Sequence, residues 1–185
     1  SPRHCGGEYK VAPMEPRLHA FELGRCATNA YVVAPPEGQG DACWIVDPGE
    51  DPRPLLRFLL ASGLKPSAVL CTHAHADHIA GLEAVLAATG DLPVLAHAAE
   101  HAWFGDPMLN LSQFIGDPVS VRAPTGTLQD GQELVLGPMR WKVLHTPGLA
   151  LTLLSIPALT DDGYAVTFTF TGASVLRDGC PIMVA

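Results

Sequence analysis

The sequence predicts a single α/β domain over residues 17–185, preceded by an extended arm over residues 1–16. Its 185 residues suit one domain with a sizeable core. Hydrophobic residues make up 48% of the chain and charged residues only 16%, which is typical of a globular protein. Short β-branched stretches also alternate with helical patterns, and neither an internal repeat nor a long linker divides the chain.

The first half of the domain predicts strands that alternate with helices. Alternating or β-branched stretches predict strands at 17–23, 28–34, 42–46, 67–72 and 92–97. Helices are expected over 51–63 and 79–90. Asp51 is a candidate N-cap for the first helix, and Gly63 and Gly90 suit the two helix ends.

The second half predicts mostly β-structure. A short helical turn at 98–104 and a loop at 105–118 precede it. Segments 133–137 and 140–146 predict a hairpin through Gly137 and Pro138. Two further apolar segments, 149–159 and 164–172, flank a turn at 161–163.

Charge and cysteine content limit the function classes. The net charge is −8 and the 11 Lys and Arg form no run, so direct nucleic-acid binding is not expected. No apolar run reaches the roughly 20 residues of a membrane span. The five cysteines form no CxxC pair, which favours reduced thiols in an intracellular compartment, cytoplasmic or mitochondrial. The first residue, Ser1, is compatible with a tag scar or a removed presequence.

The segment THAHADHIAG, residues 72–81, carries the candidate metal site. It follows an apolar strand and holds His73, His75, Asp77 and His78 within six positions. Imidazole and carboxylate groups suit zinc, and they also suit iron or manganese. Alternate residues 73 and 75 can point the same way, and Asp77 and His78 at the next helix can face a second ion. Two neighbouring ions could share a bridging hydroxide, which is a strong nucleophile.

This segment resembles the HxHxDH motif of the metallo-β-lactamase superfamily. TNAYVV, WIVDPGE, VLHTPG and FTGASVLRDGC resemble further segments of its glyoxalase II (hydroxyacylglutathione hydrolase) branch, so the resemblance covers residues 17–180. It implies an αββα sandwich with four layers and a site at one edge of the two sheets. It also implies metal-dependent hydrolysis of a thioester such as an acyl-glutathione.

The sequence departs from the family pattern at the remaining ligands. Leu149 stands where the resemblance implies a metal-binding histidine, and Ala173 stands where it implies a bridging aspartate. The chain ends at Ala185, before the last expected histidine, which predicts a C-terminally truncated sandwich. A catalytic zinc normally keeps three protein ligands and a water molecule. We therefore expect one weakly bound zinc ion or none, with iron less favoured.

Other donors are less suited to complete the site. His145 is the nearest candidate, because it lies four residues before Leu149. Cys71 is expected to be a buried apolar thiol. Ordinary surface positions are predicted for a further group of polar residues: His97, Glu100, His101 and Asp106.

These observations are compatible with two functions and with one explanation that involves no natural function. In the first, the chain is a catalytically degenerate relative of a glyoxalase II-type hydrolase and serves as a structural or accessory subunit with protein partners. In the second, it is an active hydrolase with an atypical single-metal site, where Asp77 orients or deprotonates the attacking water. A fragment, or changes introduced at Leu149 and Ala173, would also explain the pattern.

Overall fold

The computed structural model describes residues 15–145, 155–156, 164–169, 172–177 and 180–184. The segments after residue 145 are strands that are joined by backbone pairing. The predicted arm lies outside the described residues up to residue 14. Among the helices described, none is long and apolar enough to cross a bilayer.

The main sheet has six strands in the order β1-β2-β3-β4-β5-β6. The first three strands pair antiparallel, and β3 to β6 pair parallel. Their bounds are β1 Arg17–Leu23, β2 Thr28–Ala34, β3 Ala42–Val46, β4 Lys65–Leu70, β5 Val94–His97 and β6 Gly126–Leu128. The parallel part follows from the predicted alternation of strands and helices, because parallel neighbours need crossover connections.

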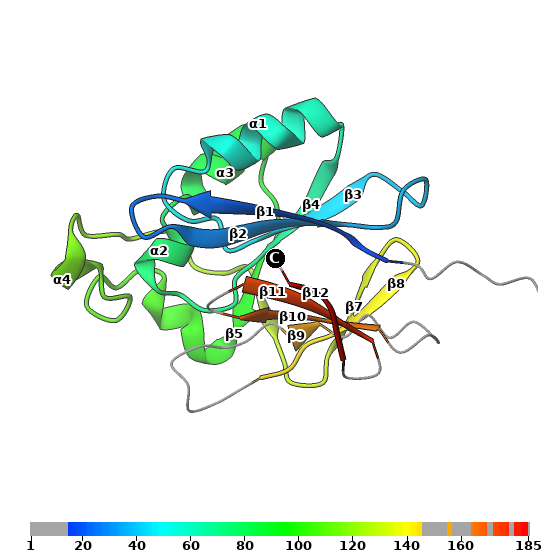
Figure 1. Cartoon of the computed structure of the whole chain (residues 1–185). Coiled ribbons are helices and arrows are strands. Elements are labelled where there is room, and N and C mark those ends of the chain that lie inside the picture. The colour runs from blue at the N-terminus through cyan, green and yellow to red at the C-terminus, as the bar shows by residue number, and fades with distance from the viewer. Residues whose placement is uncertain (1–14, 146–154, 157–163, 170–171, 178–179, 185) are drawn as a thin grey trace, which may run out of the picture.

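Two longer helices, α1 (Arg53–Ser62) and α3 (Leu82–Thr89), cover one face of this sheet (Figure 1). Three short helices lie along its carboxyl edge and the following loops: α2 (Ala76–Ile79), η1 (Ala98–Trp103) and α4 (Ser112–Ile115). The helix α4 interrupts the segment 105–118, for which the sequence predicted only a loop.

A second sheet lies across the other face of the main sheet (Figure 1). Its four strands run in the order β12-β11-β10-β9, and a separate hairpin joins β7 to β8. The bounds are β7 Glu133–Leu136, β8 Met139–Lys142, β9 Ser155–Ile156, β10 Tyr164–Thr169, β11 Gly172–Arg177 and β12 Cys180–Val184. The described residues thus form three layers of the expected sandwich: a helical layer, the main sheet and the second sheet.

The main sheet is buried on both faces, which explains its nearly continuous apolar strands. Ile45 packs toward α1 in a cluster that includes Leu55. Its neighbour Trp44 belongs to the cluster on the opposite face, where its ring meets Trp141 at 5.7 Å between centroids. Alternation along β3 therefore fixes both layers against one central sheet.

The predicted boundaries of α1 are partly correct. Gly63 ends the helix in the left-handed region, at φ 72°, as its sequence position suggested. Asp51 is not the N-cap, because Pro52 occupies that position and no side chain caps the helix. The Asp51 carboxylate instead pairs with Arg53, two residues further along the chain.

Candidate metal centre

The parallel register of β3 and β4 brings two polar segments together. Val46 and Leu70, the last residues of these strands, are register partners. Asp47 follows β3, and its N–H donates to the Leu70 carbonyl at 3.0 Å. Thr72 and His73 follow β4 at the same sheet edge, where open parallel sheets commonly place binding sites.

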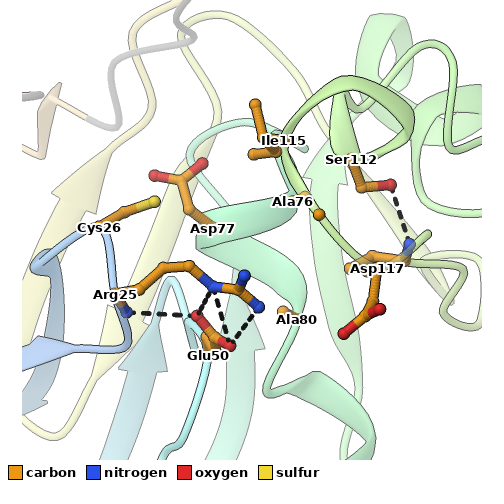
Figure 2. A pocket seen from close by; sticks show the side chains of 11 residues that line it. Arg25, Cys26, Glu50, Ala76, Asp77, Ala80, Ser112, Ile115 and Asp117 are labelled. Atoms are coloured by element: carbon orange, nitrogen blue, oxygen red, sulfur yellow. Dashed lines mark hydrogen bonds and ion pairs between the residues drawn. The ribbon is translucent and has the colours of Figure 1, made fainter.

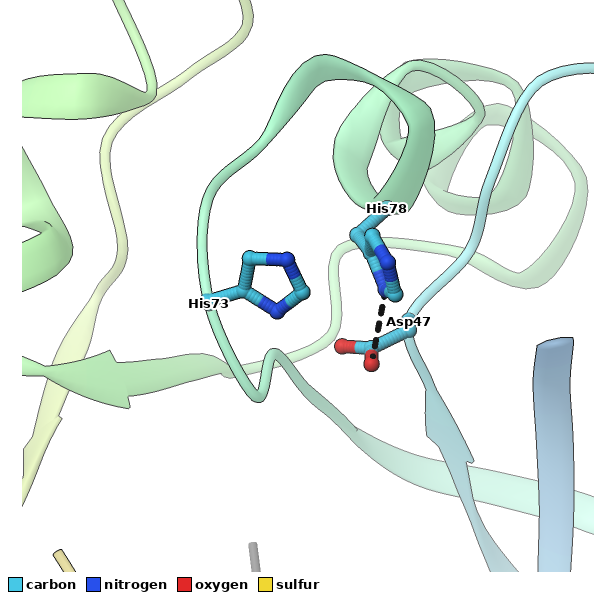
Figure 3. A group of neighbouring side chains, drawn as sticks. All are labelled: Asp47, His73 and His78. Atoms are coloured by element: carbon cyan, nitrogen blue, oxygen red, sulfur yellow. Dashed lines mark hydrogen bonds and ion pairs between the residues drawn. The ribbon is translucent and has the colours of Figure 1, made fainter. Parts of the chain in front are cut away.

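The Asp47 carboxylate is the centre of a buried hydrogen-bond network, of which Figure 3 shows the bond to His78. Its Oδ1 accepts the Thr72 N–H at 2.7 Å, and its Oδ2 accepts the Thr72 hydroxyl at 2.5 Å. Oδ2 also lies 3.0 Å from Nδ1 of His78. Asp47 has φ 50°, a conformation that non-glycine residues rarely adopt, and these bonds offset its strain.

This network assigns the tautomers of two histidines. The Thr72 hydroxyl donates its hydrogen bond to Asp47. The hydroxyl oxygen can therefore only accept from Nδ1 of His73, which lies 3.0 Å away. Nδ1 of His78 likewise donates to the Asp47 carboxylate. Neutral His73 and His78 then carry their lone pairs on Nε2, the atom available to a metal.

Nε2 of His73 is buried and has no hydrogen-bond partner in the described part of the chain. Its ring lies 4.0 Å from the His78 ring and 4.8 Å from the His75 ring, measured between centroids. An orphaned imidazole nitrogen is costly in a protein interior, whereas a metal ion would satisfy it. This atom is the clearest sign of a metal-binding pocket.

Asp77 completes the cluster on the side of the helix α2. Its Oδ2 accepts the Thr28 hydroxyl at 2.7 Å and lies 3.4 Å from Nε2 of His78. Asp77 therefore faces the nitrogen of His78 that Asp47 leaves free. The predicted set His73, His75, Asp77 and His78 is brought together by α2 and the loop before it.

Geometry also groups Asp47 with His73 and His78, whose potential ligand atoms lie within 4.8 Å of one another. The Asp47 oxygens already accept three hydrogen bonds, so we assign Asp47 to orienting the histidines rather than to binding the ion. The sequence analysis missed Asp47 and Thr72. The sequence feature that could have indicated Asp47 is the Asp-Pro-Gly turn directly after β3. That buried strand runs parallel to β4, the strand that precedes the histidines.

The pKa values of the three histidines differ because their surroundings differ. Burial lowers the pKa of His73 to about 4, and the neighbouring His78 adds to this shift. Burial also lowers the pKa of His75. Burial would lower the pKa of His78 as well, but the charge and hydrogen bond of Asp47, together with Asp77, outweigh it and raise the pKa. These shifts favour the neutral, metal-binding form of His73 and His75, whereas the shift of His78 favours its protonated form, which competes with metal binding.

The other candidate donors lie elsewhere. The His145 ring stacks on His97 at 3.7 Å between centroids, and Nε2 of His101 lies 3.2 Å from the Ala96 carbonyl. Cys71 is buried, as predicted, and burial raises the pKa of its thiol. Leu149 lies outside the described residues.

Ala173 lies in β11, where its backbone pairs with Phe168 of β10. Asp106 and Glu100 were both predicted to be ordinary surface charges, and of these two Glu100 departs from the prediction. Asp106 accepts the Met108 N–H at 2.8 Å. Glu100 accepts the Ala74 N–H at 3.0 Å, between two of the metal histidines, so its prediction as a solvated charge was wrong.

A cavity of about 340 Å³ adjoins the cluster at Asp77 (Figure 2). Apolar side chains line one part of it: Ala76 of α2, Ala80 directly after that helix, and Ile115 of α4. Arg25 lies on its wall and forms an ion pair with Glu50 at 2.9 Å. The cavity can accept a mostly apolar group beside a carboxylate.

Comparison with known proteins places this architecture in a family. Residues 23–159 match the model of the metallo-beta-lactamase superfamily, and the chain belongs to that superfamily. It is 35% identical over 127 residues to a probable metallo-hydrolase, YqgX, of Bacillus subtilis, covering 68% of this chain and 58% of the relative. It is 33% identical over 150 residues to a hydroxyacylglutathione hydrolase of Hahella chejuensis, covering 81% of this chain and 49% of the relative. The chain therefore spans about half to three fifths of these relatives.

Solved structures confirm the predicted fold class. The BLEG-1 B3 metallo-beta-lactamase superposes with a TM-score of 0.69 at 32% identity, covering 79% of this chain and 69% of that one. A di-iron-bound form of TTHA1623 superposes with a TM-score of 0.57 at 32% identity, covering 70% and 61% of the two chains. The chain is thus a hydrolase-like member of the superfamily with a partial metal site.

Proposed function

We propose that this chain holds at most one divalent ion weakly at His73, His75, Asp77 and His78, and that it does not turn over a thioester. In this proposal the chain is a catalytically degenerate relative of the glyoxalase II-type hydrolases. It acts as an accessory subunit, kept for its fold and its surface.

The retained half of the site fits an ion held from one side. The orphaned Nε2 of His73 and the oriented Nε2 of His78 are suitable nitrogen donors. A zinc ion bound there would lower the pKa of its water molecule, which is the chemistry such an ion supplies to hydrolases. Asp77 could orient that water, although Thr28 and His78 already share its carboxylate.

The observation that carries the degeneracy is the pair of hydrocarbon side chains at positions 149 and 173. Leu149 and Ala173 both lie inside the chain, and neither has an atom that can bind a metal. In the family pattern these positions close the site opposite the HxHxDH segment. Because both side chains are hydrocarbon, the nitrogen donors come only from the loop before α2 and from α2 itself. A site with donors on one side binds a metal ion weakly.

An apolar surface supports the accessory role. Five large hydrophobic residues of segment 108–115 are exposed: Met108, Leu109, Leu111, Phe114 and Ile115. A concentration of exposed apolar side chains in one segment favours a protein partner. We therefore propose that the partner is another protein chain. Replacement of Phe114 with Glu should abolish association with a co-purifying subunit while it leaves the thermal unfolding temperature unchanged.

The proposal is tested by metal content and turnover measured on one preparation. The purified chain is dialysed, its zinc and iron contents are measured, and hydrolysis of an acyl-glutathione thioester is followed with and without chelator. We expect less than stoichiometric metal and no chelator-sensitive hydrolysis. Stoichiometric metal together with chelator-sensitive hydrolysis would overturn the proposal.

An active hydrolase with a single metal ion is the second candidate. The orphaned Nε2 of His73 favours it, because a buried, unpaired nitrogen is retained at a cost in stability. In that case Asp77→Asn would abolish hydrolysis, whereas Asp106→Asn, which removes a carboxylate from a turn, would leave it unchanged.

A further inference from the structure

Glu100 lies outside the set of metal donors, yet it contacts the histidine loop directly. It belongs to η1, and its Oε2 accepts the Ala74 N–H at 3.0 Å. Ala74 is a buried residue between His73 and His75. The carboxylate of Glu100 therefore binds the backbone at the one residue that separates these two histidines.

This contact is one of three that bind alternate N–H groups of the loop. Asp47 accepts from Thr72 N at 2.7 Å, Glu100 accepts from Ala74 N, and the Asn110 carbonyl accepts from Ala76 N at 3.0 Å. Asp47 follows β3 and Glu100 follows β5, the strands on either side of β4, so these acceptors hold the loop from both sides. The intervening residues are the two histidines that follow β4.

The same short helix also contacts a histidine ring. The Trp103 ring lies 5.7 Å from that of His75, measured between centroids. The segment η1 thus contacts both the backbone of the loop and the ring of His75.

We propose that Glu100 is a positioning residue, whose bond to the Ala74 N–H sets the relative placement of the His73 and His75 rings. A carboxylate that accepts a backbone N–H forms a strong hydrogen bond. Such outer contacts commonly control how well metal ligands are oriented. The consequence for metal affinity rests on the proposed function, whereas the placement of the rings can be measured without metal.

The first test uses the metal-free full chain and three variants. Glu100→Ala removes the acceptor, and Glu100→Gln keeps an oxygen that can accept. Glu83→Ala is the matched control, because Glu83 accepts the Arg122 N–H at 2.9 Å and binds no residue of the histidine loop. Hydrogen exchange of the Ala74 N–H and NMR shifts of the His73 and His75 rings are measured.

We expect Glu100→Ala to speed exchange of the Ala74 N–H by at least about tenfold, as for loss of a charge-assisted hydrogen bond. It should also shift both ring signals, and Glu100→Gln should restore most of the protection. Unchanged exchange in Glu100→Ala, or equal changes in Glu83→Ala, would overturn the positioning role.

The second test measures Zn²⁺ affinity by competition with a chromophoric chelator. Glu100→Ala should weaken binding by about 10- to 100-fold, the usual effect of losing an outer contact, and Glu100→Gln should weaken it less. Equal affinities of Glu100→Ala and the wild-type chain would contradict the positioning role. Absence of Zn²⁺ binding by the wild-type chain would agree with the proposed function, which allows at most one weakly held ion, and the exchange measurement would then decide the positioning role alone.

Discussion

Nδ1 of His78 lies 3.0 Å from Oδ2 of Asp47, and this hydrogen bond leaves Nε2 of His78 as the free nitrogen. The two residues are 31 positions apart in the chain. They meet because β3 and β4 run parallel and end at the same edge of the main sheet. The sheet topology therefore selects the histidine atom that faces Asp77.

Replacement of Asp47 with Asn tests this relationship. An amide N–H facing Nδ1 would force His78 into the opposite tautomer, with the proton on Nε2. We expect Zn²⁺ affinity to fall by about 10- to 100-fold and the unfolding free energy to fall by roughly 1–3 kcal/mol. The tautomer is measured from the ¹⁵N shifts of His78 in the metal-free chain at mildly alkaline pH.

Asp41→Asn is the control for that change, because Asp41 forms an exposed ion pair with Lys65. Such exposed pairs contribute little to stability. A wild-type tautomer of His78 in Asp47→Asn would contradict the assigned role of Asp47.

Much of the fold could be predicted from local sequence patterns. The strands β1, β2 and β3 were predicted because their alternation is strong and turns bound them. Gly63 marked the end of α1 because a helix commonly ends in a left-handed residue, a conformation that glycine adopts readily. The helix α4 was missed because its four residues are too few to show a period.

The site could be predicted only where its residues are contiguous. The histidine cluster was evident because His73 to His78 lie within six positions. Asp47 and Glu100 were missed as parts of the site because each acts through a contact set by the tertiary fold, at 25 to 31 residues from its partner. No local pattern distinguishes such carboxylates from solvated charges.

Gly81 is predicted to be intolerant of any side chain. A Cβ at this position would lie 2.1 Å from the Gly49 carbonyl oxygen, in the turn that carries Asp47. We expect Gly81→Ala to lower the unfolding free energy by about 3 kcal/mol through overpacking. Gly105→Ala, where a Cβ meets nothing within 4 Å, should change it little. Denaturant unfolding measures both, and equal values would contradict the close approach of the two turns.

The cysteines are predicted to differ in reactivity. Cys26 is exposed, whereas Cys43 and Cys71 are buried. Burial raises the pKa of Cys43 to about 12, and it raises that of Cys71 as well, so neither forms the reactive thiolate near neutral pH. A thiol reagent should label Cys26 in the folded chain, and it should label Cys43 and Cys71 only after unfolding. Peptide mass spectrometry would detect early labelling of Cys43, which would contradict the described core.

Asn110 is predicted to be a structural anchor of the loop beside the site. It is fully buried, and its amide donates to the Trp103 and Val119 carbonyls at 3.1 and 2.8 Å. Asn110→Ala would remove both bonds and the two that its Oδ1 accepts from the buried Ser112, so we expect a loss of about 2–4 kcal/mol in unfolding free energy. Gln113→Ala, on the exposed side of the same segment, should cost less than about 0.5 kcal/mol. Similar losses in the two variants, measured by thermal unfolding, would argue against this anchor.

The central claim is that hydrocarbon at position 149 prevents stable metal binding. The most direct measurement is the zinc retained per chain after dialysis, compared between the wild-type chain and Leu149→His, with Leu151→His as the matched control. The account predicts well under one ion for the wild-type chain and Leu151→His, and about one ion for Leu149→His, which restores the histidine that the family pattern implies at position 149. Two zinc ions retained by the wild-type chain would contradict it.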